Sequence, residues 1–454
     1  LLQALPKIEH LVEAAKNEGM DALALTDNGN LYGAIEFYKA AKDAKIKPII
    51  GVDFYVALGS RKEKRPGIDN RRTRLVLLAE NKAGYQNLIK LVTDSHLEGF
   101  YYKPRVDIET LTRWQEGLIA LIPAFGSNVG VALRANDIEK ARAHLDAYKA
   151  IYGEDRTFLE LTAHPEIDEH EVLMERIAAL SKTSGVPLAA GQEVFYIEPS
   201  DKPARTTLLS IQQAAFERAD DDDGDFSFLS KERAEEIFAK YPEALLNTRR
   251  IAERCTLELE LGKWMFPDLP KEKGKTYDQM LRELAYEGAK TRNLTLSEDT
   301  QKRINYELEV IKNKGFSPYF LVVADLLNYA REHGIYTTTR GSVGGSIISY
   351  LTYITTVDPI EYKLPFERFL NPERPSAPDI DMDLADNRRD ELIEYARTKY
   401  GTDHVAQIGT FGTMMARGAV RDVARAMGKP YALGDSIAKA IPFGSQGFPM
   451  TIEH

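Results

Sequence analysis

Three aspartates, Asp379, Asp381 and Asp383, alternate with the apolar residues Ile380 and Met382 in the second half of the chain. Alternate side chains of a β-strand point to the same side, so a strand here places the three carboxylates on one face. Same-side residues lie roughly 7 Å apart along the backbone, and flexible carboxylates at that spacing can converge on two divalent ions about 3.5–4 Å apart. The pattern indicates a metal site for phosphoryl transfer, with a solvated strand face as the alternative.

A glycine-rich segment, residues 340–346, runs directly into the apolar residues 347–351. Its glycines allow backbone N–H groups to approach an anion, a helix that begins there adds partial positive charge, and Arg340 and the serines supply further donors. No Gly-Lys-Ser/Thr sequence follows, which excludes a Walker A loop, and the acidic residue of a dinucleotide-binding fingerprint is missing. Because this segment lies close to the three aspartates in the sequence, we interpret it as a phosphate loop. An ordinary turn is the alternative.

Basic residues follow the three aspartates. Asp386 or Asn387 is predicted to cap a helix of about residues 388–399, which places Arg388 and Arg389 in its first turn beside the carboxylates. We expect these two arginines to neutralise phosphate charge; a solvated helix face is the alternative.

A second group of arginines lies farther along the chain. Arg417, Arg421 and Arg425 recur at every fourth residue, so a helix there carries a basic stripe on one face. We expect this stripe to contact phosphates, and again a solvated face is the alternative.

Five segments in this part of the chain together resemble the alpha subunit of bacterial DNA polymerase III. They are residues 340–342, 364–374, 378–383, 387–391 and 410–414. The resemblance implies nucleotidyl transfer with two Mg²⁺ ions held by the catalytic residues Asp381 and Asp383, and we add Asp379 as a further metal ligand. It also implies that the third catalytic aspartate of the family lies beyond residue 454, so we expect this chain by itself to be inactive.

The same resemblance assigns contacts with the nucleotide triphosphate to Arg340, Gly341 and Ser342. From the patterns above, the further candidates for phosphate binding are Ser346, Arg388 and Arg389. One departure concerns residues 337–339, which are threonines where the family commonly has Gly-Pro-Gly.

The first part of the chain alternates between predicted strands and helices. Residues 21–27 and 48–56 are predicted strands, and residues 31–44 between them are a predicted amphipathic helix. Such alternation favours a barrel-like α/β domain. Three segments here resemble the polymerase and histidinol phosphatase (PHP) domain that opens the same polymerase family; they are residues 26–33, 97–105 and 191–196.

Active PHP domains gather His, Asp and Glu ligands around a metal cluster, and this sequence departs from that set. Asn28 stands where a histidine is expected, Asp53 where a glutamate is common, and Arg74 in place of another histidine. Glu193 and Phe195 replace an Asp and His pair. A phenyl ring offers no ligand atom and a guanidinium repels the ion, so we expect the PHP metal to be lost.

Composition sets wider limits. At 454 residues the chain is long enough for two or three domains. Its formal net charge of −10 implies that any nucleic-acid binding comes from local patches. The single cysteine, Cys255, excludes a disulfide framework and suits a reducing cytoplasm, and no apolar run reaches membrane-spanning length.

These observations predict an α/β multidomain protein. We expect a barrel-like PHP domain with a helical extension and linker in residues 1–270, a nucleotidyltransferase-type α+β palm in residues 271–412, and the start of a helical thumb in residues 413–454. The linker is expected near residues 266–275, where proline, glycine and charged residues gather.

The function implied by the resemblance is template-directed DNA synthesis in the bacterial cytoplasm. The implied partners are primer–template DNA, deoxynucleoside triphosphates, the sliding clamp and the clamp loader, with a proofreading exonuclease subunit as a further candidate. Two alternatives remain open: a PHP-type metal-dependent phosphoesterase or 3′–5′ exonuclease, and a non-catalytic scaffold of the replisome.

Overall fold

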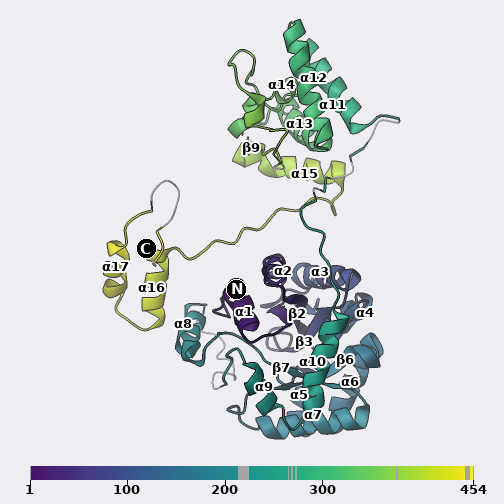
Figure 1. Ribbon diagram of the computed structural model, residues 1–454, viewed down its shortest axis with the longest axis vertical. Helices are drawn as coiled ribbons and strands as arrows, with labels where there is room; N and C mark the ends of the chain where they lie inside the picture. The colour runs from purple at the N-terminus through teal and green to yellow at the C-terminus, as the bar shows by residue number, and fades with distance from the viewer. Residues whose placement is uncertain are drawn as a thin grey trace. The chain divides into compact units, whose positions relative to one another are not determined.

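The structure is a computed structural model (Figure 1). The residues that it describes are 2–212, 224–263, 265–266, 269–270, 274–374, 377–444 and 450–452. The chain divides into two compact units, one formed by Leu1–Glu260 together with Thr413–His454 and the other by Leu261–Gly412. The predicted linker near residues 266–275 falls partly outside the described residues, and the domain boundaries given above stay predictions.

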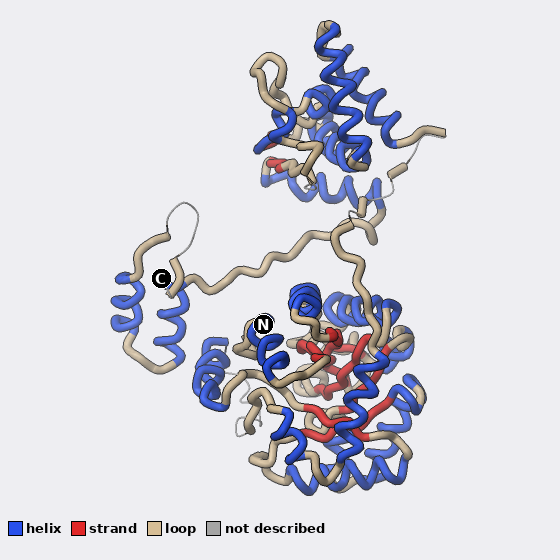
Figure 2. The backbone as a smooth tube through the Cα atoms, in the orientation of Figure 1, coloured by secondary structure: helices blue, strands red, loops and turns tan. Residues whose placement is uncertain are grey.

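The first unit is built on a curled sheet of seven strands (Figure 2). Its strands are β1 (Ala22–Asn28), β2 (Lys47–Ala57), β3 (Arg72–Ala79), β4 (Arg105–Val106), β5 (Leu118–Ile122), β6 (Thr157–Thr162) and β7 (Leu188–Gly191). The order is β1-β2-β3-β5-β6-β7, with β4 paired to β2. β3 is antiparallel to both of its neighbours, and the other pairs are parallel.

The first unit also contains helices, and the inner residues of many of them join the core with the strands. They are α1 (Ile8–Asn17), α2 (Ala34–Asp43), α3 (Lys82–Leu97), α4 (Ile108–Arg113), α5 (Asn128–Arg134), α6 (Ile138–Tyr152), α7 (His170–Ser184), α8 (Lys202–Gln212), α9 (Lys231–Ile237), α10 (Pro242–Arg254), α16 (Ala416–Ala426) and α17 (Tyr431–Ala440). The predicted strand–helix–strand unit near the start of the chain is confirmed, because β1 pairs in parallel with β2 and α2 connects them.

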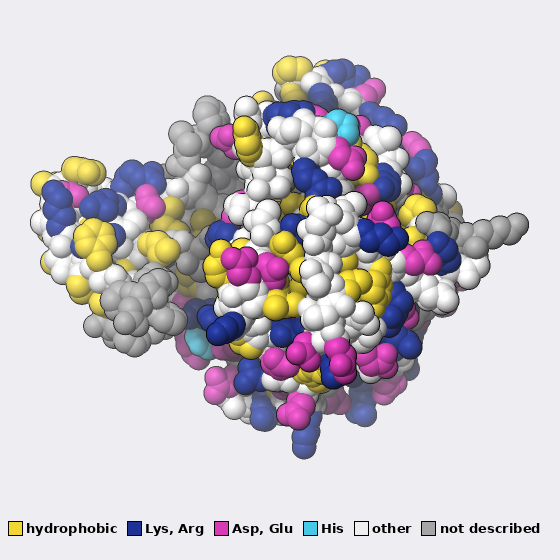
Figure 3. Space-filling view, turned by 90° about the horizontal axis from the view of Figure 1, so that it is seen from above, with side chains coloured by type: hydrophobic (Ala, Val, Ile, Leu, Met, Phe, Trp, Pro, Cys, Tyr) yellow, Lys and Arg dark blue, Asp and Glu magenta, His cyan; other side chains and the backbone are white. Residues whose placement is uncertain are grey.

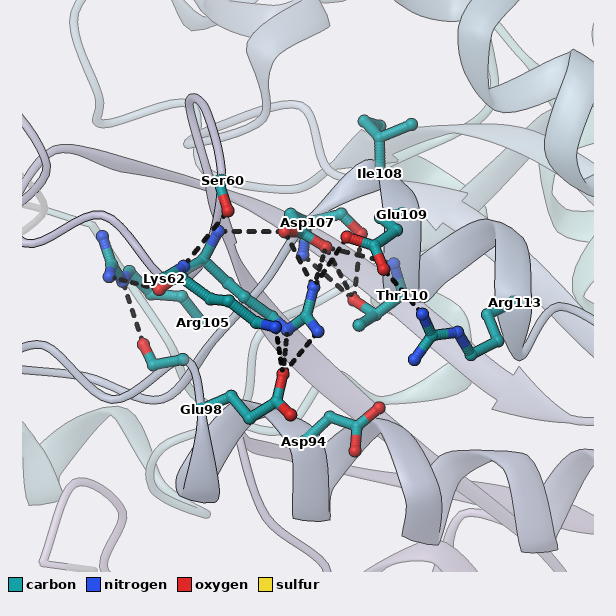
Figure 4. Close-up of polar contacts among 12 residues, drawn as sticks. Ser60, Lys62, Asp94, Glu98, Arg105, Asp107, Ile108, Glu109, Thr110 and Arg113 are labelled. Carbon is teal, nitrogen blue, oxygen red and sulfur yellow. Dashed lines mark hydrogen bonds and ion pairs between the residues drawn. The ribbon is translucent and has the colours of Figure 1, made fainter.

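Two buried arginines stabilise the conformation of the connection between β2 and β3 (Figure 4). Arg61 donates to Asp107 at 3.1 Å and to Glu98 at 3.1 Å, and Figure 4 shows these acidic side chains converging on one place. Arg105 donates to four backbone carbonyls, those of Arg61, Glu63, Asp69 and Gly99. Buried charges are tolerated when they are paired and hydrogen-bonded, so this network serves the fold of the loop.

The second unit is mostly helical and has a small two-stranded sheet. Its elements are α11 (Tyr277–Thr291), α12 (Glu298–Asn313), α13 (Ser317–Glu332), β8 (Thr337–Arg340), the 3-10 turn η3 (Gly341–Gly345), α14 (Ile347–Leu351), η4 (Phe366–Arg368), β9 (Asp381–Leu384), η5 (Asp386–Arg388) and α15 (Arg389–Tyr400). Leu281, Phe320, Ile347 and Phe366 are fully buried in its core. The predicted fold class, an α/β multidomain protein with a barrel-like first domain followed by an α+β domain, is confirmed: the first unit has a curled sheet, and the second is largely helical with a small sheet.

Helices α11 and α14 meet at a glycine. A Cβ atom added at Gly288 would lie 1.7 Å from the carbonyl oxygen of Leu351. Only a residue without a side chain allows the backbones to approach this closely, so Gly288 fixes how α14 packs on α11. This contact matters because α14 directly follows the glycine-rich segment.

Candidate active site on the two-stranded sheet

Antiparallel pairing of β8 and β9 brings the glycine-rich segment beside the aspartates. In the register of this ladder, Arg340 is opposite Asp381 and Thr338 is opposite Asp383. The two motifs lie apart in the sequence, and the sheet joins them in one place. Arg340 is the last residue of β8, so η3 starts directly beside the first residue of β9.

The core decides which way the aspartates face. Ile380 is buried and Met382 packs against the core of the second unit. Because the side chains alternate along the strand, Asp381 and Asp383 lie on the opposite side. Asp379 and Asp381 are exposed and Asp383 is half-buried. β9 begins at Asp381, so Asp379 precedes the strand that the alternation predicts.

Tyr319 supports this segment from α13. Its hydroxyl oxygen accepts a hydrogen bond from the backbone N–H of Ile380 at 3.2 Å. Burial raises the pKa of Tyr319, and the negative charges of Asp379 and Asp381 raise it further. The phenol therefore stays neutral and holds the start of β9 without adding charge to the acidic face.

Arg340 forms a bidentate ion pair with Asp383. Its Nη2 donates to Oδ1 at 2.9 Å, and its Nε contacts Oδ2. Both side chains are accessible, 66% for Arg340 and 40% for Asp383. Exposed pairs are weak, so a divalent cation can displace Arg340 from Asp383, or a phosphate can displace Asp383 from Arg340, at small cost.

Gly341 supplies the accessible backbone of the glycine-rich segment. It has a φ angle of +87°, and no atom would lie within 4 Å of a Cβ added there. The left-handed conformation favours glycine, and the open space leaves the backbone approachable by a ligand. Ser342 is half-exposed, and Val343 anchors the turn in the core.

Ser346 does not reach this surface. It is fully buried, its hydroxyl donates to Glu307 at 2.8 Å, and its Oγ accepts from the N–H of Ser349. The carboxylate of Glu307 also accepts the N–H groups of Ile347 at 3.1 Å and Ile348 at 3.2 Å. The sequence predicts a phosphate at the start of α14, but the internal carboxylate of Glu307 occupies this position.

The two arginines after β9 have different surroundings. Arg388 pairs with Glu391, with Nε–Oε2 at 3.0 Å, and donates to the carbonyl of His333 at 2.8 Å. Arg389 is exposed and donates to Gln407 at 3.1 Å. Arg388 therefore closes the turn after the strand, whereas Arg389 is the more accessible cation.

The helix that carries these arginines begins one residue later than predicted. α15 runs from Arg389, and η5 occupies residues 386–388 before it. No side chain caps its N-terminus, so the predicted capping by Asp386 or Asn387 is wrong. The helix is held from α13 instead, where Tyr329 stacks on Tyr395 with ring centroids 3.7 Å apart.

The basic stripe on α16 is largely used within the protein. Arg417 donates to the carbonyl of Ile441 at 2.9 Å, and Arg421 donates to Asp435 on α17 at 2.9 Å. Arg425 is exposed and contacts Asp422. Two of the three arginines thus connect α16 to α17 or to Ile441, which directly follows α17. The interpretation of the stripe as one phosphate-binding surface is not supported. Basic and acidic side chains are interspersed over the face drawn in Figure 3.

A second polar cluster lies on the sheet of the first unit. Arg74 on β3 donates from Nε to Asp53 on β2 at 2.9 Å, and its Nη2 contacts both Asp53 and Glu193. Burial raises the pKa of Asp53, and the guanidinium opposes this rise. Desolvation, assisted by the charge of Glu193, raises the pKa of Glu160 to about 8.

This cluster clarifies the sequence departures from a PHP metal site. The guanidinium lies between Asp53 and Glu193, two of the positions where the resemblance expects metal ligands. Asn28, at a third position, donates to Gln3 at 2.5 Å. Within the described residues, no group of three or more His, Cys, Asp or Glu side chains is arranged to hold a metal ion. Sequence reasoning missed Glu160, although an acid inside the apolar run of β6 was a readable signal.

Mg²⁺ is compatible with the acidic face of β9. Carboxylate oxygens are hard donors, and Mg²⁺ is commonly held by one or two carboxylates together with substrate phosphates and water. Asp381 and Asp383 supply such a pair, and Asp379 lies just before the strand.

Comparisons with known proteins agree on both parts of the chain. A family model described as the bacterial DNA polymerase III alpha NTPase domain matches residues 279–454, and a model of the PHP domain matches residues 1–164. DNA polymerase III subunit alpha of Aquifex aeolicus is 40% identical and is matched over 100% of this chain and 41% of its own length. The corresponding subunit of Borreliella burgdorferi is 40% identical, over 98% of this chain and 39% of the relative.

A third relative, DNA polymerase III subunit alpha of Bacillus subtilis, is 39% identical over 97% of this chain and 39% of its own length. The chain thus spans about two fifths of the length of these relatives. Among solved structures, an amidohydrolase from Chromobacterium violaceum aligns with a TM-score of 0.29 and 13% identity, over 42% of this chain and 82% of the other. No described helix is long and apolar enough to cross a membrane.

Proposed function

We propose, because the chain belongs to the family of bacterial DNA polymerase III alpha subunits, that it carries part of the site for template-directed DNA synthesis. The observation that supports this proposal is the β8–β9 ladder, which sets Arg340 and the glycine-rich segment beside Asp381 and Asp383. Carboxylates for metal ions and donors for phosphates are the two needs of nucleotidyl transfer.

In this proposal Asp381 and Asp383 hold two Mg²⁺ ions, and Asp379 is an additional ligand. When bound, the ions activate the primer 3′-hydroxyl and stabilise charge on the departing pyrophosphate. The chain's contribution is to fix the carboxylates: β9 holds their spacing, and the packing of Ile380 and Met382 fixes the direction in which they point.

Arg340 takes two partners in turn. In the structure it pairs with Asp383 and so neutralises the acidic face. If Asp383 held a cation, the guanidinium of Arg340 would be free to contact the phosphates of a nucleotide, together with the backbone of Gly341 and Ser342. Arg389 is a further candidate for charge neutralisation because it is exposed, whereas Arg388 is held by Glu391. We leave Ser346 out of the nucleotide contacts because it is buried.

The wider assignments are proposals that follow from the family. We propose that primer–template DNA and deoxynucleoside triphosphates are the substrates, in the cytoplasm, and that the sliding clamp and clamp loader are partners. For the first unit we propose a scaffold role that includes docking of a proofreading subunit. The ion pairs of Arg74 with Asp53 and Glu193 support this role over that of a phosphoesterase, since a guanidinium and a metal ion compete for the same carboxylates.

Isosteric replacement of the carboxylates tests the catalytic assignment. In a polypeptide of the relatives' full length that carries this sequence, Asp381→Asn and Asp383→Asn should abolish primer extension, and Asp379→Asn should reduce it less. Loss of a metal ligand removes several kcal/mol of transition-state stabilisation, and about 1.4 kcal/mol is a factor of ten, so we expect a loss of about a thousandfold.

The matched control is Asp390→Asn, which removes an exposed carboxylate on α15. It should extend primers at the wild-type rate. Near-normal extension by the Asp381 variant at saturating Mg²⁺, with the circular dichroism spectrum unchanged, would refute the assignment.

A further inference from the structure

Glu307 is a fully buried carboxylate that contacts the last residue of the glycine-rich segment, Ser346, from the interior of the protein. It lies on α12, with 0% of its side chain exposed. Its two oxygens accept the hydroxyl of Ser346 and the N–H groups of Ile347 and Ile348, as described above. These donors are the first groups of α14, so the carboxylate satisfies the start of this short helix from inside the protein.

Arg303 completes the arrangement. One turn before Glu307 on α12, it donates from Nε to the carboxylate at 2.6 Å. Its Nη2 also donates to the carbonyl of Gly345 at 2.9 Å and to that of Leu364 at 3.2 Å. One guanidinium thus ties the end of η3 to the segment that contains Phe366, which is buried in the core of the second unit.

These bonds leave the glycine-rich segment little freedom. A Cβ atom added at Gly345 would lie 2.6 Å from the carbonyl oxygen of Pro365, so the two backbones are in contact. The side chains of Ile347 and Ile348 are fully buried, so water cannot replace Glu307 as the partner of their N–H groups. The segment is therefore fixed at its inner end, and its outer end at Gly341 stays exposed beside Arg340.

We infer that Glu307 and Arg303 are a positioning pair, which fixes residues 340–346 from inside the fold for contact with the phosphates of a nucleotide. The inference rests on the proposed function. Neither residue touches the nucleotide; both act through the backbone of the segment. Preorganised donors bind a phosphate without paying for their own ordering, and displacement by about 1 Å can cost about a hundredfold.

Glu307→Gln tests the inference because it keeps the shape and removes the charge. An amide must turn one N–H₂ group toward donors that already point at it, so the inner end of the segment loses at least one bond. In a polypeptide of the relatives' full length, we expect KM for the nucleotide to rise about 10- to 100-fold, while kcat stays within about threefold because β9 and its carboxylates are not displaced. Glu309→Gln, an exposed change on the same helix, should leave both constants unchanged.

A second variant guards against misfolding. If Glu307→Gln does not give folded protein, Ser346→Ala removes one bond to the carboxylate and should raise KM by a smaller factor. A purely structural role would lower the melting temperature and leave KM of the folded enzyme unchanged, and that result would overturn the inference. Asp381→Asn distinguishes failure of the proposed function from failure of the positioning role. If this variant keeps wild-type extension, the proposed function is wrong. If it is inactive and Glu307→Gln has a wild-type KM, only the positioning role is wrong.

Discussion

Replacement of Arg74 by methionine should destabilise the first unit in a way that depends on pH. The side chain of Asp53 is 5% exposed, and those of Arg74 and Glu193 are each 22% exposed. Removing one partner of a buried ion pair costs about 3–5 kcal/mol, and the partial exposure here reduces the expected loss to about 2–3 kcal/mol at pH 8. This corresponds to a fall in melting temperature of roughly 4–10 °C.

The direction of the pH dependence follows from Asp53. Burial already raises its pKa in the folded protein, and the loss of the guanidinium raises that pKa further. An acid whose pKa is higher in the folded state favours folding at low pH, and this contribution is lost as the pH rises through the folded value. The deficit of Arg74→Met relative to wild type should therefore be small near pH 4.5 and full at pH 8.

Differential scanning calorimetry of both proteins at the two pH values measures this deficit. Arg71→Met, which removes an exposed cation one residue before β3, is the matched control and should melt within about 1–2 °C of wild type. If Arg74→Met melts with the wild type at pH 8, or loses as much at pH 4.5 as at pH 8, the ion pair does not carry the stability argued here.

Two further predictions concern folding. Glu160→Gln should raise the melting temperature at pH 9 but not at pH 4, because the wild-type carboxyl has a pKa of about 8 and its favourable neutral form is lost as the pH rises through that value; a melting curve at each pH checks this. Gly288→Ala should lower the free energy of unfolding of the second unit by about 1–3 kcal/mol, because the added Cβ would lie 1.7 Å from the carbonyl oxygen of Leu351; urea unfolding followed by circular dichroism should show a lower midpoint, and an unchanged midpoint would contradict it.

The sequence predicts those parts of the site that are local. Alternation of polar and apolar residues around Asp381 predicts one acidic face, and the structure has Ile380 and Met382 packed on the other side. Positive φ at Gly341 agrees with a turn that only a glycine-rich segment forms readily. In each case the signal is the spacing of neighbouring residues, and the backbone geometry of a strand or turn converts that spacing into a direction.

The sequence does not predict contacts that join distant segments. A glutamate in the middle of an amphipathic helix is normally a solvated residue, and nothing in the pattern around Glu307 shows that its carboxylate meets the start of α14. The same holds for Arg421, whose spacing predicts an exposed stripe but whose partner is Asp435 on the next helix.

One physical rule connects these cases. A charged side chain whose partner is distant in the sequence resembles a ligand-binding group in the sequence pattern. Folding often supplies that partner from far along the chain. Arg340 has an accessible partner, Asp383, which is itself a carboxylate of the kind that a cation can bind. Where the partner is buried, as Glu307 is for the start of α14, the charge is committed to the fold. Burial of the partner therefore marks a charge that is committed to the fold, whereas accessible pairs such as Arg340–Asp383 and Arg388–Glu391 are the weaker ones.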